Sequence, residues 1–307
     1  RIKKDVLLNA ATVALDARGG NAGAGTGGNV QFDGTINSTG GVRALTITAG
    51  TGDVTLAGTV GATSALGNLT IAGNDISIAT IGGAAAGAAA TSLTASNAGA
   101  DTGDIAMNGA INVTGLTLNA GTSISAANMI KAGTLAATLT GASSALNLGA
   151  AANQISTLNA ITTPGGFTLN NGNNSLTVAA NVTATNNAVS IDTGTGTYTQ
   201  ANNVDVIAGT GPITVVADAV TIGTTNGGNN AFSTSGALTL KPKTAGRAMS
   251  LAGASAFDIS ATEMARFATG ATGPLVIGDT ASTGVLTIGA ALAMGGRTLV
   301  LNGGSIT

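Results

Sequence analysis

The stretch from Leu45 to Ser92 reads LTITAGTGDVTLAGTVGATSALG followed by NLTIAGNDISIATIGGAAAGAAATS, and it contains two copies of one plan. The triplet Leu45–Ile47 recurs 24 positions later as Leu69–Ile71. We interpret Leu93–Ala95, after another 24 positions, as the start of a third copy. A self-similar period of about 20 to 50 residues is typical of solenoids and propellers.

Each copy contains two further short segments in which apolar and small polar residues alternate. Gly, Asn, Asp and Thr separate these segments, as expected of turns between strands. Each copy therefore predicts three short strands. The second segments are Val54–Leu56, Ile76–Ile78 and Ile105–Met107, and the third lie at Val60, Ile81 and Ile111–Val113.

Alternation with period 2 sends the apolar residues of a strand to one side and the Thr to the other. Strands this short bury an apolar face only when each turn stacks on the next around a common interior. Because aromatic residues are only 2% of the chain, that interior must be narrow. The fold class is therefore predicted to be all-β, a parallel β-helix (β-solenoid) of about 24 residues and three short strands per turn. A propeller blade needs about 40 residues, a longer repeat than this one.

A uniform repeat over 307 residues predicts a single β-solenoid array spanning 1–307, which at that period has about 13 turns. Hydrophobic residues at 44% indicate a folded chain, although only 8% of the residues are charged. A net charge of −2 gives no basic face for nucleic acid. The chain contains neither Cys nor His, which excludes disulfides and thiolate or imidazole ligands.

The repeat runs to both ends of the chain without the polar caps that a solenoid uses to cover its open edges. We therefore expect a segment of a longer protein, or a subunit that associates with itself end-to-end or side-by-side. The basic start Arg1–Lys4 leads into repeat sequence rather than an apolar signal core. Ile81–Ala90 is too short and too rich in Gly to cross a bilayer, so no membrane insertion is expected.

Two Gly-rich features are interpreted as turns. The loop Arg18–Asn29 resembles a nucleotide-binding loop in its Gly spacing, but the sequence after it predicts a strand rather than a helix, and it lacks aspartates for calcium. Asn-Gly pairs are expected to mark tight turns with positive φ, and they begin at Asn108, Asn171, Asn226 and Asn302.

The repeat is interrupted between Lys241 and Gly273, and we expect a loop and short-helix excursion over 241–273. Ser260 or Thr262 is expected to cap the helix, with Glu263 in its first turn. Three of the eleven basic residues gather in seven positions at the start of this segment. They form a possible interaction loop for an acidic glycan or a neighbouring subunit, and the alternative is a solvated loop. They are Lys241, Lys243 and Arg247.

The phrases TAGTGDVTLAG and ALGNLTIAG within 45–92 resemble the repeats of filamentous-haemagglutinin-like exoproteins and autotransporter-type surface proteins of Gram-negative bacteria. Leu238–Phe267, LTLKPKTAGRAMSLAGASAFDISATEMARF, and the LVIGD of Leu275–Asp279 resemble an insert that recurs in the same group. The resemblance implies a right-handed β-helix, secretion through a partner pore or an autotransporter barrel, and a role in adhesion, biofilm or filament scaffolds.

Enzymes that cleave acidic polysaccharides also use parallel β-helices, but they need clustered carboxylates with a cation beside them. The tightest acidic group is Asp101 with Asp104, which is interpreted as a turn before a strand. Asp53 and Asp75 precede the second strands of adjacent turns and are interpreted as a ladder of turn residues. With one Tyr (Tyr198), no Trp and no His, we predict no enzyme, no catalytic residue, no metal site and no cofactor.

We therefore expect a structural or adhesive segment of a large secreted bacterial surface protein, at the cell surface or outside the cell. It would form a rigid shaft or a self-assembling fibre, with a host or matrix glycan or protein as a further partner. The alternatives are a glycan-binding module on a β-helix and a β-helix polysaccharide lyase or hydrolase. A third hypothesis is ice binding by outward Thr rows, such as Thr46 and Thr70, although the outward residue varies along the row.

Overall fold

The computed structural model describes residues 1–19, 27–96, 102–225, 230–267, 271–292 and 296–307. The chain is all-β with almost no helix, and its parallel strands stack as a β-solenoid of about 11 turns, with about 23 residues per turn. It divides into two compact units, Arg1–Ile155 and Ser156–Thr307. The parallel β-helix prediction is confirmed. The predicted 13 turns were too many, because corner loops and the segment after Lys241 take residues out of the coil.

The first unit contains fourteen complete strands among its described residues. They are β1 (Val6–Leu8), β2 (Thr12–Asp16), β3 (Val30–Phe32), β4 (Ile36–Ser38), β5 (Ala44–Thr48), β6 (Val54–Val60), β7 (Leu66–Gly73), β8 (Ile76–Ile81), β9 (Ala88–Ala95), β10 (Asp104–Met107), β11 (Ile111–Ala120), β12 (Ser123–Ala126), β13 (Ile130–Leu139) and β14 (Leu146–Leu148).

Strand β15 (Gln154–Thr163) crosses the division between the units. The described strands of the second unit are β16 (Phe167–Asn170), β17 (Leu176–Val178), β18 (Val182–Ala184), β19 (Val189–Asp192), β20 (Thr197–Gln200), β21 (Val206–Gly209), β22 (Ile213–Val216), β23 (Ala219–Ile222), β24 (Phe232–Thr234), β25 (Leu238–Lys241), β26 (Met249–Leu251), β27 (Phe257–Ile259), β28 (Leu275–Ile277), β29 (Val285–Ile288), β30 (Leu299–Leu301) and β31 (Ser305–Ile306). The helix α1 is Ala261–Ala265.

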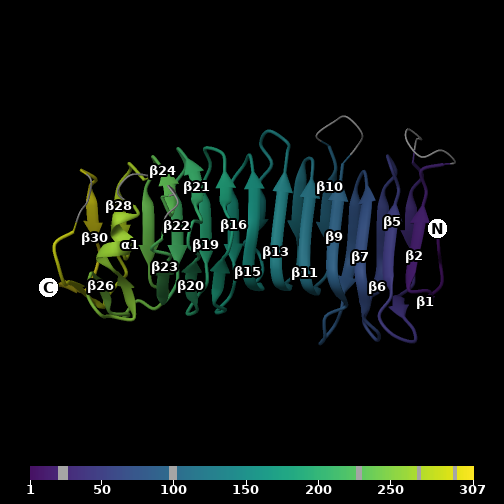
Figure 1. Cartoon of the computed structure of the whole chain (residues 1–307), viewed down its shortest axis with the longest axis horizontal. Helices are drawn as coiled ribbons and strands as arrows, with labels where there is room; N and C mark the ends of the chain where they lie inside the picture. The colour runs from purple at the N-terminus through teal and green to yellow at the C-terminus, as the bar shows by residue number, and fades with distance from the viewer. Residues whose placement is uncertain (20–26, 97–101, 226–229, 268–270, 293–295) are drawn as a thin grey trace. The chain divides into compact units, whose positions relative to one another are not determined.

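In the first unit, strands of successive turns lie side by side and run in the same direction (Figure 1). Equivalent residues of these strands pair in register, so that like side chains stack in columns. One column runs through Val54, Ile76, Ile105 and Ile124, all of them buried. Burying such a side chain contributes roughly 1.5–3 kcal/mol relative to leaving it in water. The inward positions of the predicted triplets thus build the core of this unit.

The third face of the first unit has its own column, formed by Ile36, Val60, Ile81, Ile111 and Ile130. The predicted third segments lie on this face, but the one at 111–113 is not a separate strand. Strand β11 continues around the corner, and its residues from 115 onward pair on the next face. Both halves of β11 pair with β13, and the strand therefore turns this corner without a loop.

The predicted start of the third copy at Leu93 was wrong by two residues. Leu93 pairs with Ile71 rather than with Leu69, and Thr91 occupies the position above Leu69 and below Leu116. Thr91 is buried, and its Oγ1 has no hydrogen-bond partner among the described residues. A column of leucines therefore contains one buried hydroxyl group that folding has taken out of water.

The second unit is built on the same principle but has larger side chains in its interior. Phe167, Val189, Ile213 and Leu238 form one inward column. Elsewhere in this unit three aromatic rings are buried together. The Phe232 ring stacks on that of Tyr198, with centroids 6.5 Å apart, and meets that of Phe267 edge-on at 5.3 Å.

The segment after Lys241 leaves the coil, while the sheet that it leaves remains continuous. Strand β25 pairs directly with β28, with Leu238 opposite Leu275. Within the segment, β26 and β27 pair with each other and join β29 and β31 in a separate four-stranded sheet. The excursion therefore contains two strands as well as the helix.

Helix α1 closes the edge of strand β23. Ser260 is its N-cap, and a capping box joins the Ser260 and Glu263 side chains to each other's backbone N–H groups. The Glu263 carboxylate also accepts the N–H of Ile222 at 2.6 Å, and the Arg266 guanidinium donates to the carbonyl of Gly223. The Glu263 side chain thus makes a hydrogen bond to β23 that a further strand would otherwise make, and Arg266, at the C-cap, binds the residue that follows β23.

The Asn-Gly pairs are only partly the tight turns that the sequence predicts. Gly172 has a φ of 63°, as predicted. The pairs at Asn108 and Asn302 lack this conformation, because neither Gly109 nor Gly303 is among the glycines with positive φ. The pair at Asn226 lies outside the described residues.

Replacing Thr91 with Val is expected to stabilise the protein by about 1 kcal/mol, because it removes a buried, unpaired hydroxyl and keeps the branched shape. Urea unfolding of wild type and variant measures the change. The matched control is Thr70→Val on the exposed outer face, which should change stability by less than about 0.5 kcal/mol. A Thr91→Val variant less stable than wild type would contradict this account of the column.

Candidate functional site

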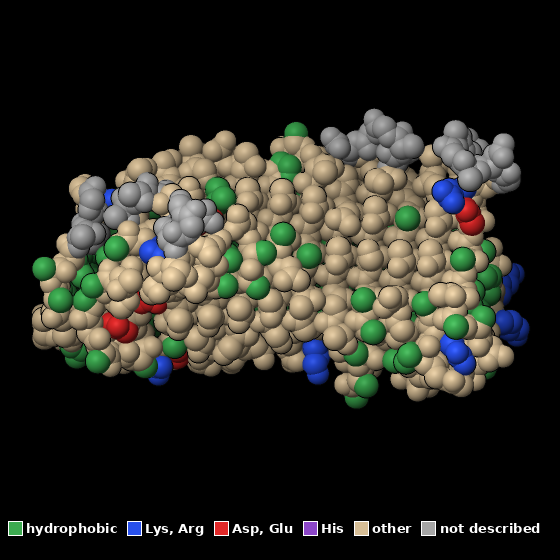
Figure 2. Space-filling view, viewed as in Figure 1, with side chains coloured by type: hydrophobic (Ala, Val, Ile, Leu, Met, Phe, Trp, Pro, Cys, Tyr) green, Lys and Arg blue, Asp and Glu red, His purple; other side chains and the backbone are tan. Residues whose placement is uncertain are grey.

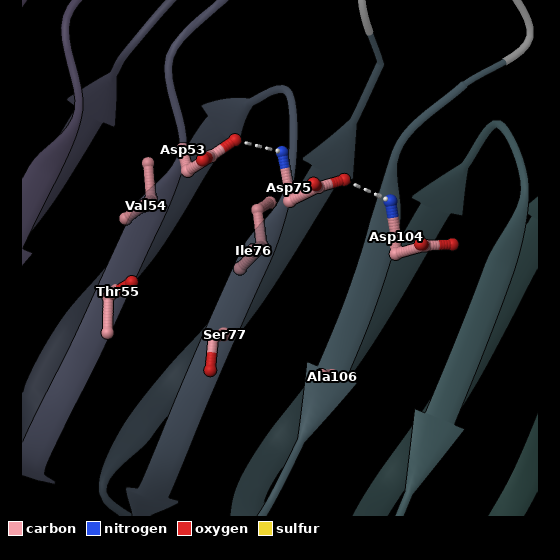
Figure 3. Close-up of a pocket in the computed structure, with 8 residues that line it drawn as sticks. All are labelled: Asp53, Val54, Thr55, Asp75, Ile76, Ser77, Asp104 and Ala106. Carbon is pink, nitrogen blue, oxygen red and sulfur yellow. Dashed lines mark hydrogen bonds between the residues drawn. The ribbon is translucent and has the colours of Figure 1, made fainter.

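Three aspartates on successive turns line an open groove of about 250 Å³ on the first unit (Figure 3). Asp53 and Asp75 directly precede β6 and β8, and Asp104 begins β10. Parallel pairing of these strands brings the three carboxylates into one row, as the sequence predicts for Asp53 and Asp75. Asp101 lies outside the described residues.

The carboxylates of this row bind the backbone of the following turn. Asp53 Oδ1 accepts the N–H of Asp75 at 3.3 Å, and Asp75 Oδ1 accepts the N–H of Asp104 at 2.9 Å (Figure 3). The row begins with Asn29 Oδ1, which accepts the N–H of Asp53, and Asp104 accepts the hydroxyl of Ser123 at 2.6 Å. We call this series of side-chain-to-backbone bonds the Asx ladder.

The same arrangement occurs in the second unit, where the members are mostly amides. Asn181 Oδ1 accepts the N–H of Asp205 at 2.9 Å, and Asp205 Oδ1 accepts the N–H of Asn230 at 3.0 Å. A bond made equally well by Asn and Asp needs an acceptor oxygen and does not need a charge. The Asx ladder is therefore a structural device of the corners.

The carboxylates of the aspartate row are engaged in hydrogen bonds between turns. Acid/base chemistry needs two carboxyl groups facing a common substrate atom with a cation beside them. Here one oxygen of each carboxylate is held by the next turn. Among the described residues, no group of three or more acidic, His or Cys side chains has the arrangement of a metal site.

The predicted interaction loop is tied to the wall of the second unit. Lys241 Nζ lies 2.9 Å from an Asp279 carboxylate oxygen, and Lys243 Nζ lies 2.8 Å from one of Asp192. Arg247 Nε donates to the main-chain carbonyl of Asp218 at 2.9 Å. We call this segment, 241–247 with its three aspartate partners, the charge strap.

The Asp218 side chain completes the charge strap by accepting the backbone N–H of Thr244 at 2.8 Å and its hydroxyl at 2.5 Å. The hydrogen bond from Lys241 holds the pKa of Asp279 below its usual value, with burial opposing it. Two of the three basic side chains are thus paired with aspartate carboxylates, and the third, Arg247, donates to a main-chain carbonyl. The sequence reveals the basic residues but not their partners, since Asp192 precedes Lys243 by 51 positions.

On the face shown in Figure 2, Lys, Arg, Asp and Glu side chains are few, and most of the surface is backbone or side chains that are neither charged nor hydrophobic. On the first unit, the row containing Thr46 and Thr70 continues through Ser92 and Thr117 but has Ala14 and Ala136 at its two ends. A Thr surface for ice is thus interrupted, and ice binding stays a hypothesis.

The single Tyr is not available to stack on a sugar. Tyr198 is fully buried, and its hydroxyl donates to Gln200 Oε1 at 2.8 Å. Burial raises the pKa of the Tyr198 hydroxyl, so it stays protonated. The aromatic groups that a glycan site would use therefore lie, in this case, inside the coil.

Comparison with known proteins finds no matching protein family, no matching curated protein and no matching solved structure. In the part of the chain that the structure describes, no helix has the length and hydropathy needed to span a membrane.

Replacing Asp75 with Ala is expected to cost about 1 kcal/mol, because the N–H of Asp104 loses its acceptor. Asp75→Asn should cost much less, because the amide oxygen of Asn accepts the same bond. Thermal or urea unfolding of both variants measures the difference. Equal destabilisation by the two would mean that the charge of Asp75 matters and that the Asx ladder is misassigned.

Replacing Lys241 with Met should raise the pKa of Asp279 toward its usual value, because its hydrogen-bonded partner is gone. Since the folded-state pKa of Asp279 is lowered, the pair stabilises the protein above the unfolded-state pKa, and this contribution disappears as pH falls through the folded-state pKa. The stability difference between wild type and Lys241→Met should therefore shrink in acid.

Carboxyl NMR titration of Asp279 and urea unfolding at neutral and acidic pH measure both effects. Lys131→Met, which changes an exposed lysine of the first unit, is the control and should leave the Asp279 titration unchanged. An unaltered Asp279 pKa in Lys241→Met would show that the two side chains are not paired in solution.

Proposed function

We propose that this chain is a structural segment of a large secreted bacterial surface protein, in which the β-solenoid acts as a rigid shaft and not as an enzyme. The observation that carries the proposal is the stacking of equivalent residues in columns, as in Val54, Ile76 and Ile105. A core of this kind grows by one turn at a time and has no fixed size. Such a core suits a protein whose task is to bridge distance.

The polar groups of the surface support the same proposal. The carboxylates that a β-helix enzyme would use accept backbone N–H groups within the Asx ladder. The cations that would stabilise a developing anion are paired with aspartates in the charge strap. These groups stabilise the coil, and each is committed to a partner within the chain.

The proposed adhesive role and extracellular location rest on the resemblance of 45–92 and 238–279 to exoprotein repeats. A shaft with few charges and many small side chains also favours close packing against further copies, as in filaments or a biofilm matrix. The alternative, a glycan-binding module, needs the basic residues of the charge strap to exchange their aspartate partners for a ligand.

Negative-stain electron microscopy of the purified protein at increasing concentration tests the shaft directly. We expect thin rods of uniform width, or ordered fibres built from them at high concentration. Particles without a long axis would contradict the proposal. A fibre with a regular axial repeat would add self-assembly to the function.

The competing functions are tested on the same preparation. Saturable binding to acidic glycans, lost when Lys241, Lys243 and Arg247 are replaced together with Ala, would replace the shaft proposal with a binding module. Turnover of an acidic polysaccharide, lost in Asp53→Asn or Asp104→Asn, would establish an enzyme. We expect neither activity.

A further inference from the structure

Two Asn-Gly pairs have opposite environments in this fold, and this difference controls a reaction that needs no enzyme. The main-chain nitrogen of the Gly can attack the side-chain Cγ of the Asn, forming a five-membered succinimide while the amide nitrogen leaves as ammonia. Water then opens the ring to Asp or isoaspartate, and no oxidant, reductant or cofactor takes part. Glycine allows the attack because it has no side chain to obstruct it.

The pair Asn171–Gly172 is protected at both reacting groups. The Asn171 side chain is fully buried, and its Nδ2 donates to the carbonyl of Asn174 at 3.2 Å. The N–H of Gly172, which would be the attacking group, donates to Oδ1 of Asn170 at 3.0 Å. Attack would have to break this bond and bring water to a buried amide, which is costly.

The pair Asn108–Gly109 is less protected at both reacting groups. Asn108 is exposed, and the bond recorded for its amide is a donation to the hydroxyl of Ser77 at 3.0 Å. In the described part of the chain, the N–H of Gly109 has no acceptor. The pair lies in the short corner between β10 and β11, where Asn108 is exposed and Gly109 is half-buried. The remaining described pair, at Asn302, is half-buried.

We propose that Asn108 is a site of spontaneous deamidation and that the fold protects Asn171 from the same reaction. The product has structural consequences at this corner. Asn108 N–H donates to the carbonyl of Ile78 at 2.8 Å, and its own carbonyl accepts from Asn128 Nδ2 at 2.8 Å. Asn108 is therefore held between the turn before it and the turn after it.

Isoaspartate at position 108 adds a methylene group to the main chain of a corner that has no spare room. A Cβ on Gly109 would lie only 1.9 Å from the carbonyl oxygen of Ala79. The longer main chain must therefore displace the turn before it or the turn after it. The hydrogen bond from Asn108 N–H to the carbonyl of Ile78 lies nearest to the added methylene group. Deamidation at Asn108 thus loosens the stacking of β10 locally.

Incubation of the folded protein at mildly alkaline pH, followed by peptide mapping with mass spectrometry, measures both sites in one molecule. Asn108 should deamidate roughly tenfold faster than Asn171 or more, the factor expected from about one lost hydrogen bond. In concentrated urea the two rates should become similar, since both pairs are then solvated. Equal rates in the folded protein, or an inert Asn108 when the unfolded chain reacts, would overturn the proposal.

Two variants test the assigned causes. Asn170→Ala frees the N–H of Gly172, so the rate at Asn171 should rise while that at Asn108 stays unchanged and serves as the internal control. Ser77→Ala removes the acceptor of the Asn108 amide and should accelerate only Asn108. A rise at both sites in Asn170→Ala would indicate that this variant unfolds. In that case Ser77→Ala alone would test whether local hydrogen bonds set the deamidation rate. No acceleration at Asn108 in Ser77→Ala would overturn the assignment.

Discussion

The structure depends on parallel hydrogen bonding in register between one turn and the next. This pairing places each residue about 4.8 Å above its equivalent in the preceding turn, so every position along the turn must suit a column of neighbours. Inward positions become columns of Val, Ile and Leu, as in Val54 and Ile76. At the corners the same constraint aligns Asp53, Asp75 and Asp104. The apolar core and the Asx ladder are thus two results of one register.

Sequence alternation identifies which side chains face inward but leaves the register less certain. A slip of one residue would turn every side chain to the other face, whereas a slip of two preserves the faces. This is why the triplets at Leu45 and Leu69 stack as predicted, while Leu93 stacks two residues away from its predicted position. The displaced register leaves a Thr in a Leu column, an arrangement that no pattern of alternation would suggest.

The polar contacts were harder to predict, because their partners lie one or more turns away. The Asx ladder joins residues 19 to 29 positions apart, and the ordinary turn motifs of Asn and Asp bind nearby backbone instead. The basic residues near Lys241 are evident in the sequence. Their partners Asp192 and Asp279 can be recognised only in the folded coil, which places them next to Lys243 and Lys241. The helix cap is local, and Ser260 with Glu263 could be predicted from their spacing alone.

The closure of β23 by α1 also bears on how the second unit comes apart. Turns of a solenoid are coupled only to their neighbours, so cooperativity passes along the ladders that join them. Beyond β23 the coupling runs through the pair β25–β28, the charge strap and the contact of Phe232 with Phe267, because the Glu263 side chain of α1 takes the place of a pairing strand. We therefore expect a boundary between two cooperative folding units at this helix, which native-state hydrogen exchange would detect as a step in protection.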